Sequence, residues 1–106
     1  MKWDPNKEGD IAELQAATWL MKQGYDVFRN QSCVGPVDMI AMCPETGEVI
    51  LVEVKKATIG PERRARGVMK PRPARYLTKK QKGMGVRLLC IYDGEVYWHE
   101  AAKDEH

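Results

Sequence analysis

Residues 35–55 read GPVDMIAMCPETGEVILVEVK and consist of two apolar runs joined by a turn sequence. The runs, residues 37–42 and 49–54, are rich in aliphatic and β-branched side chains, as buried strands are. The PETG stretch between them combines residue types that favour turns. If these four residues form the loop of a hairpin, Cys43 pairs with Glu48, and the numbers of paired residues sum to 91.

The same register places two carboxylates, Asp38 and Glu53, opposite each other on one face of the hairpin. Directly opposed Cβ atoms lie about 4.5–5.5 Å apart, where like charges destabilise a sheet. A divalent cation between the two side chains would remove this conflict, because carboxylate oxygens are the ligands that magnesium and calcium prefer. A shift of the pairing by one residue would put the carboxylates on opposite faces, so this expectation depends on the turn.

Lys55 follows Glu53 by two residues and therefore shares its strand face. Its ammonium group could neutralise part of the carboxylate charge, orient a metal-bound water, or stabilise negative charge that develops on a phosphate. The alternative interpretation is that Lys55 and Lys56 simply end the strand in solvent.

Patterns elsewhere in the chain predict the elements around this hairpin. Helical spacing of apolar residues, two-residue alternation and turn signals identify them, with Thr78 as a helix N-cap and Asp93-Gly94 as a strong two-residue hairpin turn. The elements are a helix over residues 10–24, a strand over 26–32, a short helix over 77–84, and a hairpin formed by 86–92 and 95–99. The order helix, three strands, helix, two strands predicts one α/β domain over residues 1–106, with a mixed central β-sheet flanked by helices.

Glu13 falls on the apolar side of the first predicted helix. A carboxylate on a buried stripe needs a partner, because a lone buried charge is costly. A metal-bound water or the Lys55 ammonium would serve, and so would an ordinary buried salt bridge. The apolar positions that define this stripe are Ile11, Leu14, Ala17, Leu20 and Met21.

Positive charge is concentrated between residues 55 and 82. This stretch holds eleven lysines and arginines against Glu62 alone, a net charge of +10, whereas the rest of the chain carries −8. Residues 57–75 also contain three prolines and two glycines, which predicts a mobile basic loop. Such a band suits binding to a polyanion, although a merely solvated surface is the alternative. The candidate DNA-binding residues are Lys56, Arg63, Arg64, Arg66, Lys70, Arg72, Arg75, Lys79, Lys80 and Lys82.

The composition argues against several other classes of protein. With 43% hydrophobic and 30% charged residues, the sequence is that of a globular chain rather than a disordered one. No apolar run approaches the roughly 18 residues of a membrane span, and residues 1–6 lack the apolar core of a secretion signal. Three scattered cysteines without zinc-ligand spacing favour reduced thiols. We therefore expect a cytoplasmic protein, in the host cytoplasm if a phage encodes it, with Trp19 and Trp98 in the core and His99 and His106 at the surface.

Three motifs together resemble the PD-(D/E)XK nuclease superfamily. They are GDIAE at residues 9–13, GPVDMIA at 35–41 and VEVK at 52–55, and the resemblance covers residues 7–56. It implies a restriction-endonuclease-like core and is closest to Holliday junction resolvases and related phage or intron-encoded endonucleases. One departure is that Val37 precedes Asp38 where the pattern has proline, with Pro36 shifted by one position.

The resemblance implies a set of roles. Asp38, Glu53 and the backbone carbonyl of Val54 would hold Mg²⁺, or alternatively Mn²⁺. Lys55 would position or activate the attacking water, and Glu13 would complete the acidic cluster. Two further residues are possible helpers by the same resemblance, Ser32 and Gln81, although a serine at a strand end can be purely structural.

The expected activity is that of a metal-dependent DNA endonuclease that hydrolyses phosphodiester bonds and leaves a 5′-phosphate. An Arg- and Pro-rich loop without an obvious base-reading helix favours structure-selective recognition of a Holliday junction or other branched DNA. Cutting both strands of a junction needs two active sites, which together with the small core indicates a homodimer. The alternatives are a site-specific homing or restriction-type endonuclease, and a non-catalytic nucleic-acid-binding module on the same fold.

Overall fold

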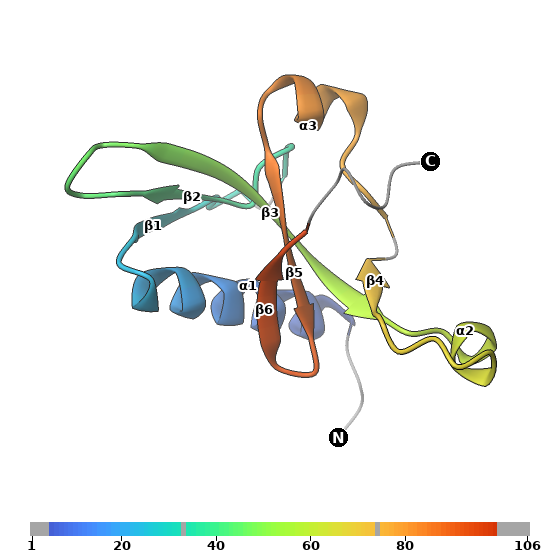
Figure 1. Ribbon diagram of the computed structural model, residues 1–106. Coiled ribbons are helices and arrows are strands. Elements are labelled where there is room, and N and C mark those ends of the chain that lie inside the picture. Colours follow the sequence, from blue (N-terminus) through green and yellow to red (C-terminus); the bar gives the residue numbers. More distant parts are fainter. Residues whose placement is uncertain (1–4, 33, 74, 100–106) are drawn as a thin grey trace.

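A computed structural model of the protein describes residues 5–32, 34–73 and 75–99. Its elements follow the predicted order, with one additional short helix and one additional short strand between residues 57 and 75 (Figure 1). They are α1 (Pro5–Lys22), β1 (Asp26–Arg29), β2 (Met39–Met42), β3 (Val49–Thr58), α2 (Pro61–Ala65), β4 (Arg72–Pro73), α3 (Lys79–Gly83), β5 (Arg87–Tyr92) and β6 (Glu95–Trp98).

The strands within these ranges form one mixed sheet in the order β1-β2-β3-β5-β6, with β4 paired to β3. The first three strands run antiparallel as a meander, and β5 lies parallel to β3. A parallel pair needs a long crossover connection. Between β3 and β5 this connection contains α2, β4 and α3. The mixed α/β architecture predicted from the sequence is therefore confirmed.

The pairing of β2 with β3 has the predicted register, in which Met39 pairs with Val52. The turn fixes it, because the Cys43 N–H donates to the Glu48 carbonyl at 2.8 Å. However, β2 begins at Met39 rather than at residue 37. The Asp38 N–H donates to the Val52 carbonyl at 2.9 Å although Val52 is already the partner of Met39. Asp38 and Met39 thus both face Val52, which is the arrangement of a β-bulge. The regular ladder therefore begins at Met39, and Asp38 lies outside it.

The first helix packs on the sheet through small side chains. Its buried residues are Ala12, Ala16, Ala17 and Leu20, and they form one core with Val52, Val54, Leu89 and Ile91. The predicted stripe was wrong for Ile11, Leu14 and Met21, which are each more than half exposed. Alanine at i, i+4 and i+5 lets the helix backbone approach the strands closely, so the helix turns its alanines inward rather than its larger residues. It also begins at Pro5 instead of residue 10, with proline in the first turn.

Side chains of β3 alternate between the two faces of the sheet. Val52 and Val54 point to the side covered by α1, which we call the α1 face. Glu53, Lys55 and Ala57 point to the other side, where Ala57 forms a second, smaller core. We call this side the α3 face because α3 contacts Glu53 there. Figure 1 shows α1 and α3 far apart on either side of β3 and β5. The other members of the smaller core are Leu88 and Cys90, with Leu77, Tyr92 and Tyr97 against them.

The segment predicted as an irregular loop over residues 57–75 contains regular structure, so that part of the prediction was wrong. The strand β3 continues through it to Thr58, because Ala57 is buried at 3% exposure. The chain then forms α2 and returns as β4, which pairs with residues 57 and 58. The Arg63 guanidinium stabilises this segment, because it donates hydrogen bonds to the carbonyls of Lys70 at 2.8 Å and Thr58 at 3.5 Å. Its mobility without DNA stays a prediction.

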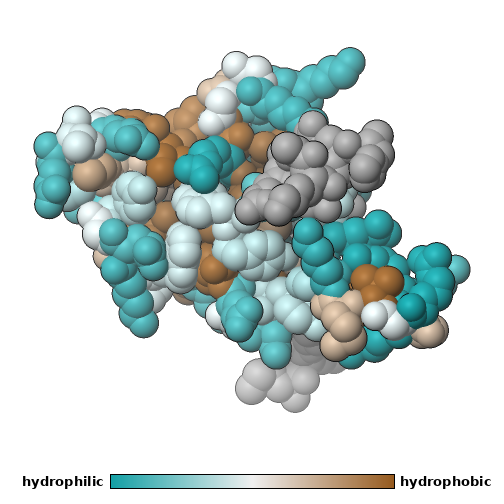
Figure 2. All heavy atoms as spheres, viewed as in Figure 1, coloured by the Kyte–Doolittle hydropathy of each residue, from teal (hydrophilic) through white to brown (hydrophobic). Residues whose placement is uncertain are grey.

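We call residues 59–73 the basic projection. Figure 1 shows it extending beyond the end of β3, and Figure 2 shows mostly hydrophilic side chains over it, with a small apolar patch. The described α3 and the β5–β6 hairpin follow the predictions more closely. Thr78 caps α3, and both Asp93 (φ 49°) and Gly94 (φ 81°) have the positive φ of a tight hairpin turn.

Two pairs of aromatic rings are in contact. Trp19 and Trp98 pack edge to face on each other, with 6.1 Å between ring centroids, and both pack against the main core, as predicted. His99 was predicted at the surface, but it is half-buried, and its ring lies 5.2 Å from that of Tyr76. His106 lies outside the described residues.

Among the described helices, none combines the length and the apolar character that crossing a membrane requires.

Candidate active site

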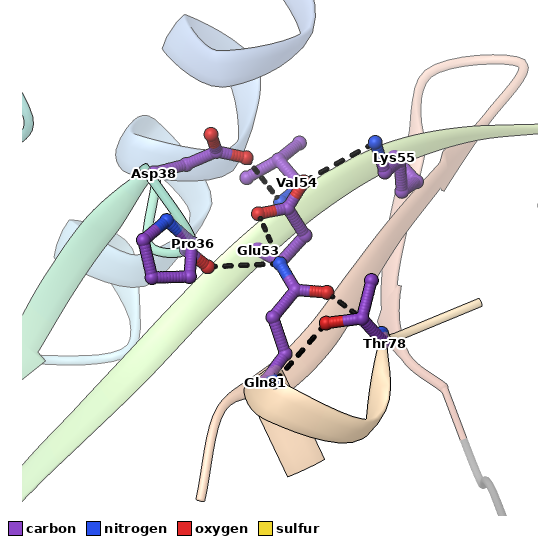
Figure 3. Close-up of polar contacts among 7 residues, drawn as sticks. All are labelled: Pro36, Asp38, Glu53, Val54, Lys55, Thr78 and Gln81. Carbon is purple, nitrogen blue, oxygen red and sulfur yellow. Dashed lines mark hydrogen bonds and ion pairs between the residues drawn. The ribbon is translucent and has the colours of Figure 1, made fainter. Parts of the chain in front are cut away.

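Glu53 is a buried carboxylate, 7% exposed, in the middle of β3. Its Oε1 atom lies 3.2 Å from the Lys55 Nζ atom, and its Oε2 atom accepts a hydrogen bond from Gln81 Nε2 at 3.1 Å (Figure 3). The contact with Lys55 follows from strand alternation, which puts residues two apart on one face. A glutamate that follows four aliphatic residues of β3 is thus held by one cation and one amide.

Asp38 meets β3 through the backbone rather than directly across a regular ladder. Its Oδ2 atom accepts a hydrogen bond from the Val54 N–H at 2.7 Å (Figure 3). The bulge before Met39 allows this, because it frees the Val54 N–H from a partner carbonyl on β2 and turns the Asp38 carboxylate toward it. The prediction that Asp38 and Glu53 face each other in a regular ladder was therefore wrong in detail, although their strands have the predicted register.

The electrostatics of Glu53 link it to Asp38. Burial raises the pKa of the Glu53 carboxyl above its ordinary value, and the charge of Asp38 raises it further. Lys55 and Gln81 lower the pKa through their contacts but do not reverse the shift. Burial and the charge of Asp38 therefore both disfavour the ionised form of Glu53, and its contacts with Lys55 and Gln81 oppose this effect. An additional cation at this place would stabilise both ionised groups.

Gln81 joins three parts of the chain. Its Nε2 atom donates to the Pro36 carbonyl at 2.9 Å as well as to Glu53, and its Oε1 atom accepts from the Thr78 N–H at 2.9 Å (Figure 3). The same side chain thus completes the capping box of α3 and ties the segment before Asp38 to β3. The sequence predicted Gln81 as a helper, and the structure places it in contact with Glu53.

Glu13 lies on the α1 side and pairs with Arg29 of β1 at 3.7 Å. The ordinary salt bridge that the sequence left open is thus the contact that forms. Burial and the Asp38 carboxylate raise the pKa of Glu13, whereas Arg29 lowers it. Glu13 is therefore within electrostatic reach of Asp38, but its ion-pair partner is Arg29 and not Lys55. Its part in an acidic cluster with Glu53 stays a prediction.

The loop before Asp38 is organised by Asn30, a residue that the sequence reasoning missed. The Asn30 Nδ2 atom donates to the carbonyls of Val34 at 2.9 Å and Val37 at 3.0 Å, and the Asn30 N–H donates to the Asp38 carbonyl at 2.9 Å. Ser32 belongs to the same turn, since its Oγ atom donates to Asn30 Oδ1 at 2.9 Å. Ser32 thus has a structural contact, as in the alternative interpretation. An asparagine at a strand end before a Gly-Pro turn was the available signal.

The residues at the site suit a hard divalent cation. Among the described residues, no group of three or more histidine, cysteine, aspartate or glutamate side chains is arranged to hold a metal ion. Magnesium does not require one, because it keeps several waters and is commonly bound by one or two carboxylates. Asp38 and Glu53 would supply the carboxylates, and the backbone carbonyl of Val54, the residue after Glu53 on β3, would be a third ligand. The donor set therefore fits Mg²⁺ better than a softer metal.

Most of the predicted DNA-binding residues form two exposed groups, and two of them, Lys56 and Arg63, belong to neither. Lys56 points to the α1 face and pairs with Glu8 at 2.7 Å. Arg63 is half-buried and holds the basic projection together. The remaining residues are exposed, either on the projection and the segment after it or on and beside α3; they are Arg64, Arg66, Lys70, Arg72, Arg75, Lys79, Lys80 and Lys82. The α3 group lies on the same side of the sheet as Glu53 and Lys55.

Comparisons with known proteins bear on the fold and the family of this chain. A structural comparison finds a bacterial homing endonuclease, I-Ssp6803I, with a TM-score of 0.63 and 16% sequence identity over 96% of this chain and 69% of that one. Comparison with curated proteins gives no significant match. The model of the Uncharacterised protein family UPF0102 matches residues 12–89. These findings support the resemblance to the PD-(D/E)XK nuclease superfamily: the chain has a nuclease-like fold and belongs to the UPF0102 family.

Proposed function

We propose that the protein is a metal-dependent DNA endonuclease whose active site is formed by Asp38, Glu53 and Lys55. The observation that carries this proposal is the state of Glu53, which is buried on the α3 face, held by Lys55 and Gln81, and electrostatically coupled to Asp38. A purely structural role does not account for two repelling carboxylates beside a lysine, because apolar residues in these strands would be more stable.

The proposed roles follow from the contacts. Asp38, Glu53 and the Val54 carbonyl would hold Mg²⁺ or Mn²⁺, which when bound supplies positive charge for the phosphate and lowers the pKa of water. The Lys55 ammonium, 3.2 Å from Glu53, would orient the attacking water and stabilise negative charge on the phosphate oxygens. Gln81 would keep the Glu53 carboxylate in one orientation. Water would attack the phosphorus, the P–O3′ bond would break, and the 3′ oxygen would leave as a hydroxyl, so that the product carries a 5′-phosphate.

DNA would lie across the α3 face. The exposed lysines of α3 and the arginines of the basic projection would contact backbone phosphates on either side of the site. These contacts carry no base code, and they make binding strongly dependent on salt. We therefore propose structure-selective cleavage, with a Holliday junction or other branched DNA as the substrate.

Two other functions differ from this one in what they require. A site-specific endonuclease would cut one sequence in a linear duplex, and the similarity of the fold to a homing endonuclease favours this second candidate. A binding module without catalysis would keep the basic surface but would not depend on the carboxylates.

A panel of DNA substrates separates the three functions. Supercoiled plasmid, a linear duplex and a four-way junction are incubated with the protein in Mg²⁺ and in EDTA. The proposal predicts Mg²⁺-dependent cleavage, fastest on the junction, and its loss in Asp38→Ala and Glu53→Ala with binding retained. Glu45→Ala, in the exposed β2–β3 turn, is the matched control and should cut normally. Binding without cleavage of any substrate would contradict the proposal.

A homodimer would supply the two active sites that a junction needs. The exposed side chains of Ile11 and Leu14 on α1 offer an apolar surface for a second copy, away from the α3 face. Light scattering after size exclusion should give twice the chain mass, and Leu14→Glu should give a monomer. A monomer for the unchanged protein on junction DNA would contradict this part of the proposal.

A further inference from the structure

A cavity of about 230 Å³ lies beside the candidate active site on the α3 face. Its floor contains Val86 and Leu88, which are 5% and 3% exposed. Leu88 is the partner of Glu53 in the parallel pairing of β5 with β3. The cavity is therefore one strand away from the carboxylate that defines the site.

Aromatic rings form the wall of this cavity. Tyr76 and His99 both line it, with 5.2 Å between their ring centroids and an interplanar angle of 43°. The His99 N–H donates to the Leu88 carbonyl at 2.9 Å, which fixes His99 against the floor. Tyr76 is 37% exposed and lines the cavity, so a ligand in the cavity can reach this residue.

The lining restricts the chemistry of a ligand. Leu77, Val86 and Leu88 are apolar, the two rings offer surfaces for stacking, and Lys82 of α3 supplies a positive charge at the same cavity. A flat heteroaromatic ring that carries a phosphate matches this combination. The volume is below the roughly 300–1,000 Å³ of a cleft for drug-sized molecules, so it suits one base rather than several.

Tyr76 also connects the cavity to the basic projection. It lines a second cavity of about 500 Å³, together with Arg63 and Arg72 of the projection. A DNA strand that runs from the projection toward Glu53 would thus pass over Tyr76. The base in a regular duplex is paired and stacked on both faces, and it cannot enter a cavity without leaving the helix.

We propose that this cavity binds one unpaired base of the DNA substrate, which stacks on Tyr76 next to the scissile phosphate. The inference rests on the proposed nuclease function and gives a physical basis for a preference for branched DNA such as forks and flaps, in which unpaired bases occur at the branch; a four-way junction would offer one only where a base pair opens at the branch point. Lys82 contacts the phosphate of that nucleotide.

Binding to forked DNA that carries 2-aminopurine tests this proposal, because stacking on an aromatic ring quenches its fluorescence. All variants are made in Asp38→Ala, so that no DNA is cut. We expect quenching when 2-aminopurine is unpaired at the fork and none when it is paired in a duplex. Tyr76→Ala should abolish the quenching and weaken fork binding by about tenfold, with less than about twofold loss on the duplex.

Two variants make the result specific to stacking. Tyr76→Phe should keep the quenching, whereas Tyr76→Leu should fill the same space without it. Phe28→Ala removes another exposed aromatic ring, on β1, and should bind the fork normally. Unchanged quenching in Tyr76→Leu, or equal losses on fork and duplex, would overturn the cavity proposal. Quenching that depends on Tyr76, in a protein that cuts no substrate with Asp38 intact, would instead overturn the nuclease proposal and leave the base site standing.

Discussion

The two faces of the sheet differ in how their buried side chains are used. The α1 face is filled by alanines of the helix and aliphatic residues of the strands. The α3 face has a smaller apolar core and a buried carboxylate, Glu53, at its edge. A single strand serves both, because alternate residues of β3 point to opposite sides. The difference indicates that the α1 face supplies stability, which allows the α3 face to keep a buried carboxylate.

The largest expected effect on stability comes from opening a cavity on the α1 face. Leu20 is fully buried, so Leu20→Ala should lower the free energy of unfolding by about 2–5 kcal/mol. Met21, the next residue, is 55% exposed, and Met21→Ala should cost less than about 0.5 kcal/mol. Urea denaturation measures both. Cleavage per folded molecule should stay normal in Leu20→Ala, and a loss there would show that the two faces are not separate in function.

On the α3 face, Glu53→Gln should have opposite effects on activity and stability. Cleavage should fall by more than about 100-fold, because a proposed cation ligand is removed. The free energy of unfolding in EDTA should rise at pH 7, because the raised pKa of Glu53 shows that its ionised form is disfavoured in the folded protein. Replacement of the carboxylate by an amide removes that cost.

The sign of the pH dependence follows from the same shift. Below the ordinary pKa of 4.5, Glu53 is protonated in both states and costs nothing. As the pH rises through that value, the unfolded chain loses its proton first, and stability falls until the pH exceeds the raised pKa of the folded state. The melting temperature of Glu53→Gln should therefore exceed that of the parent at pH 7 and match it near pH 4. Glu95→Gln, an exposed residue of β6, is the control and should show no such difference.

The sequence predicted those parts of the site that depend on local patterns. The register of β2 and β3 was correct because the PETG turn fixes it, and Glu53 and Lys55 share a face because strands alternate. The contact of Asp38 with the Val54 N–H could not be predicted, because a bulge of one residue leaves no clear mark in a short apolar run.

The orientation of α1 and the role of Asn30 depend on tertiary packing. Periodicity gave weight to Ile11 and Leu14 as large apolar residues, but close packing on the sheet selected the alanines. Asn30 acts through three backbone groups of a loop whose path exists only when β1 and β2 are paired. Neither feature is visible in the residue types alone.

A substitution at Gln81 separates helix capping from the contact with Glu53. Gln81→Glu keeps the side-chain acceptor that a capping box needs, but it places a third carboxylate beside Glu53 in place of the amide donor. Cleavage should fall roughly 10- to 100-fold while α3 stays folded. Gln81→Ala loses both contacts. Kinetics at several Mg²⁺ concentrations and circular dichroism measure the two effects, and normal cleavage in Gln81→Glu would remove Gln81 from the site.

The smallest effects are expected in the loop that leads to Asp38, where Asn30 and Ser32 can be compared directly. Asn30→Asp keeps the acceptor for Ser32 but loses the two hydrogen bonds to Val34 and Val37. It should cost about 1–2 kcal/mol of stability and lower cleavage several-fold, because the loop then holds Asp38 less firmly.

Ser32→Ala removes only an exposed hydrogen bond to Asn30 and should change neither quantity beyond about 0.5 kcal/mol or twofold. Denaturation and single-turnover cleavage of the two variants decide between a positioning and a catalytic role for this turn. If Ser32→Ala lost more activity than Asn30→Asp, the serine would act on the substrate itself. The catalytic surface would then include the turn after β1 as well as the α3 face.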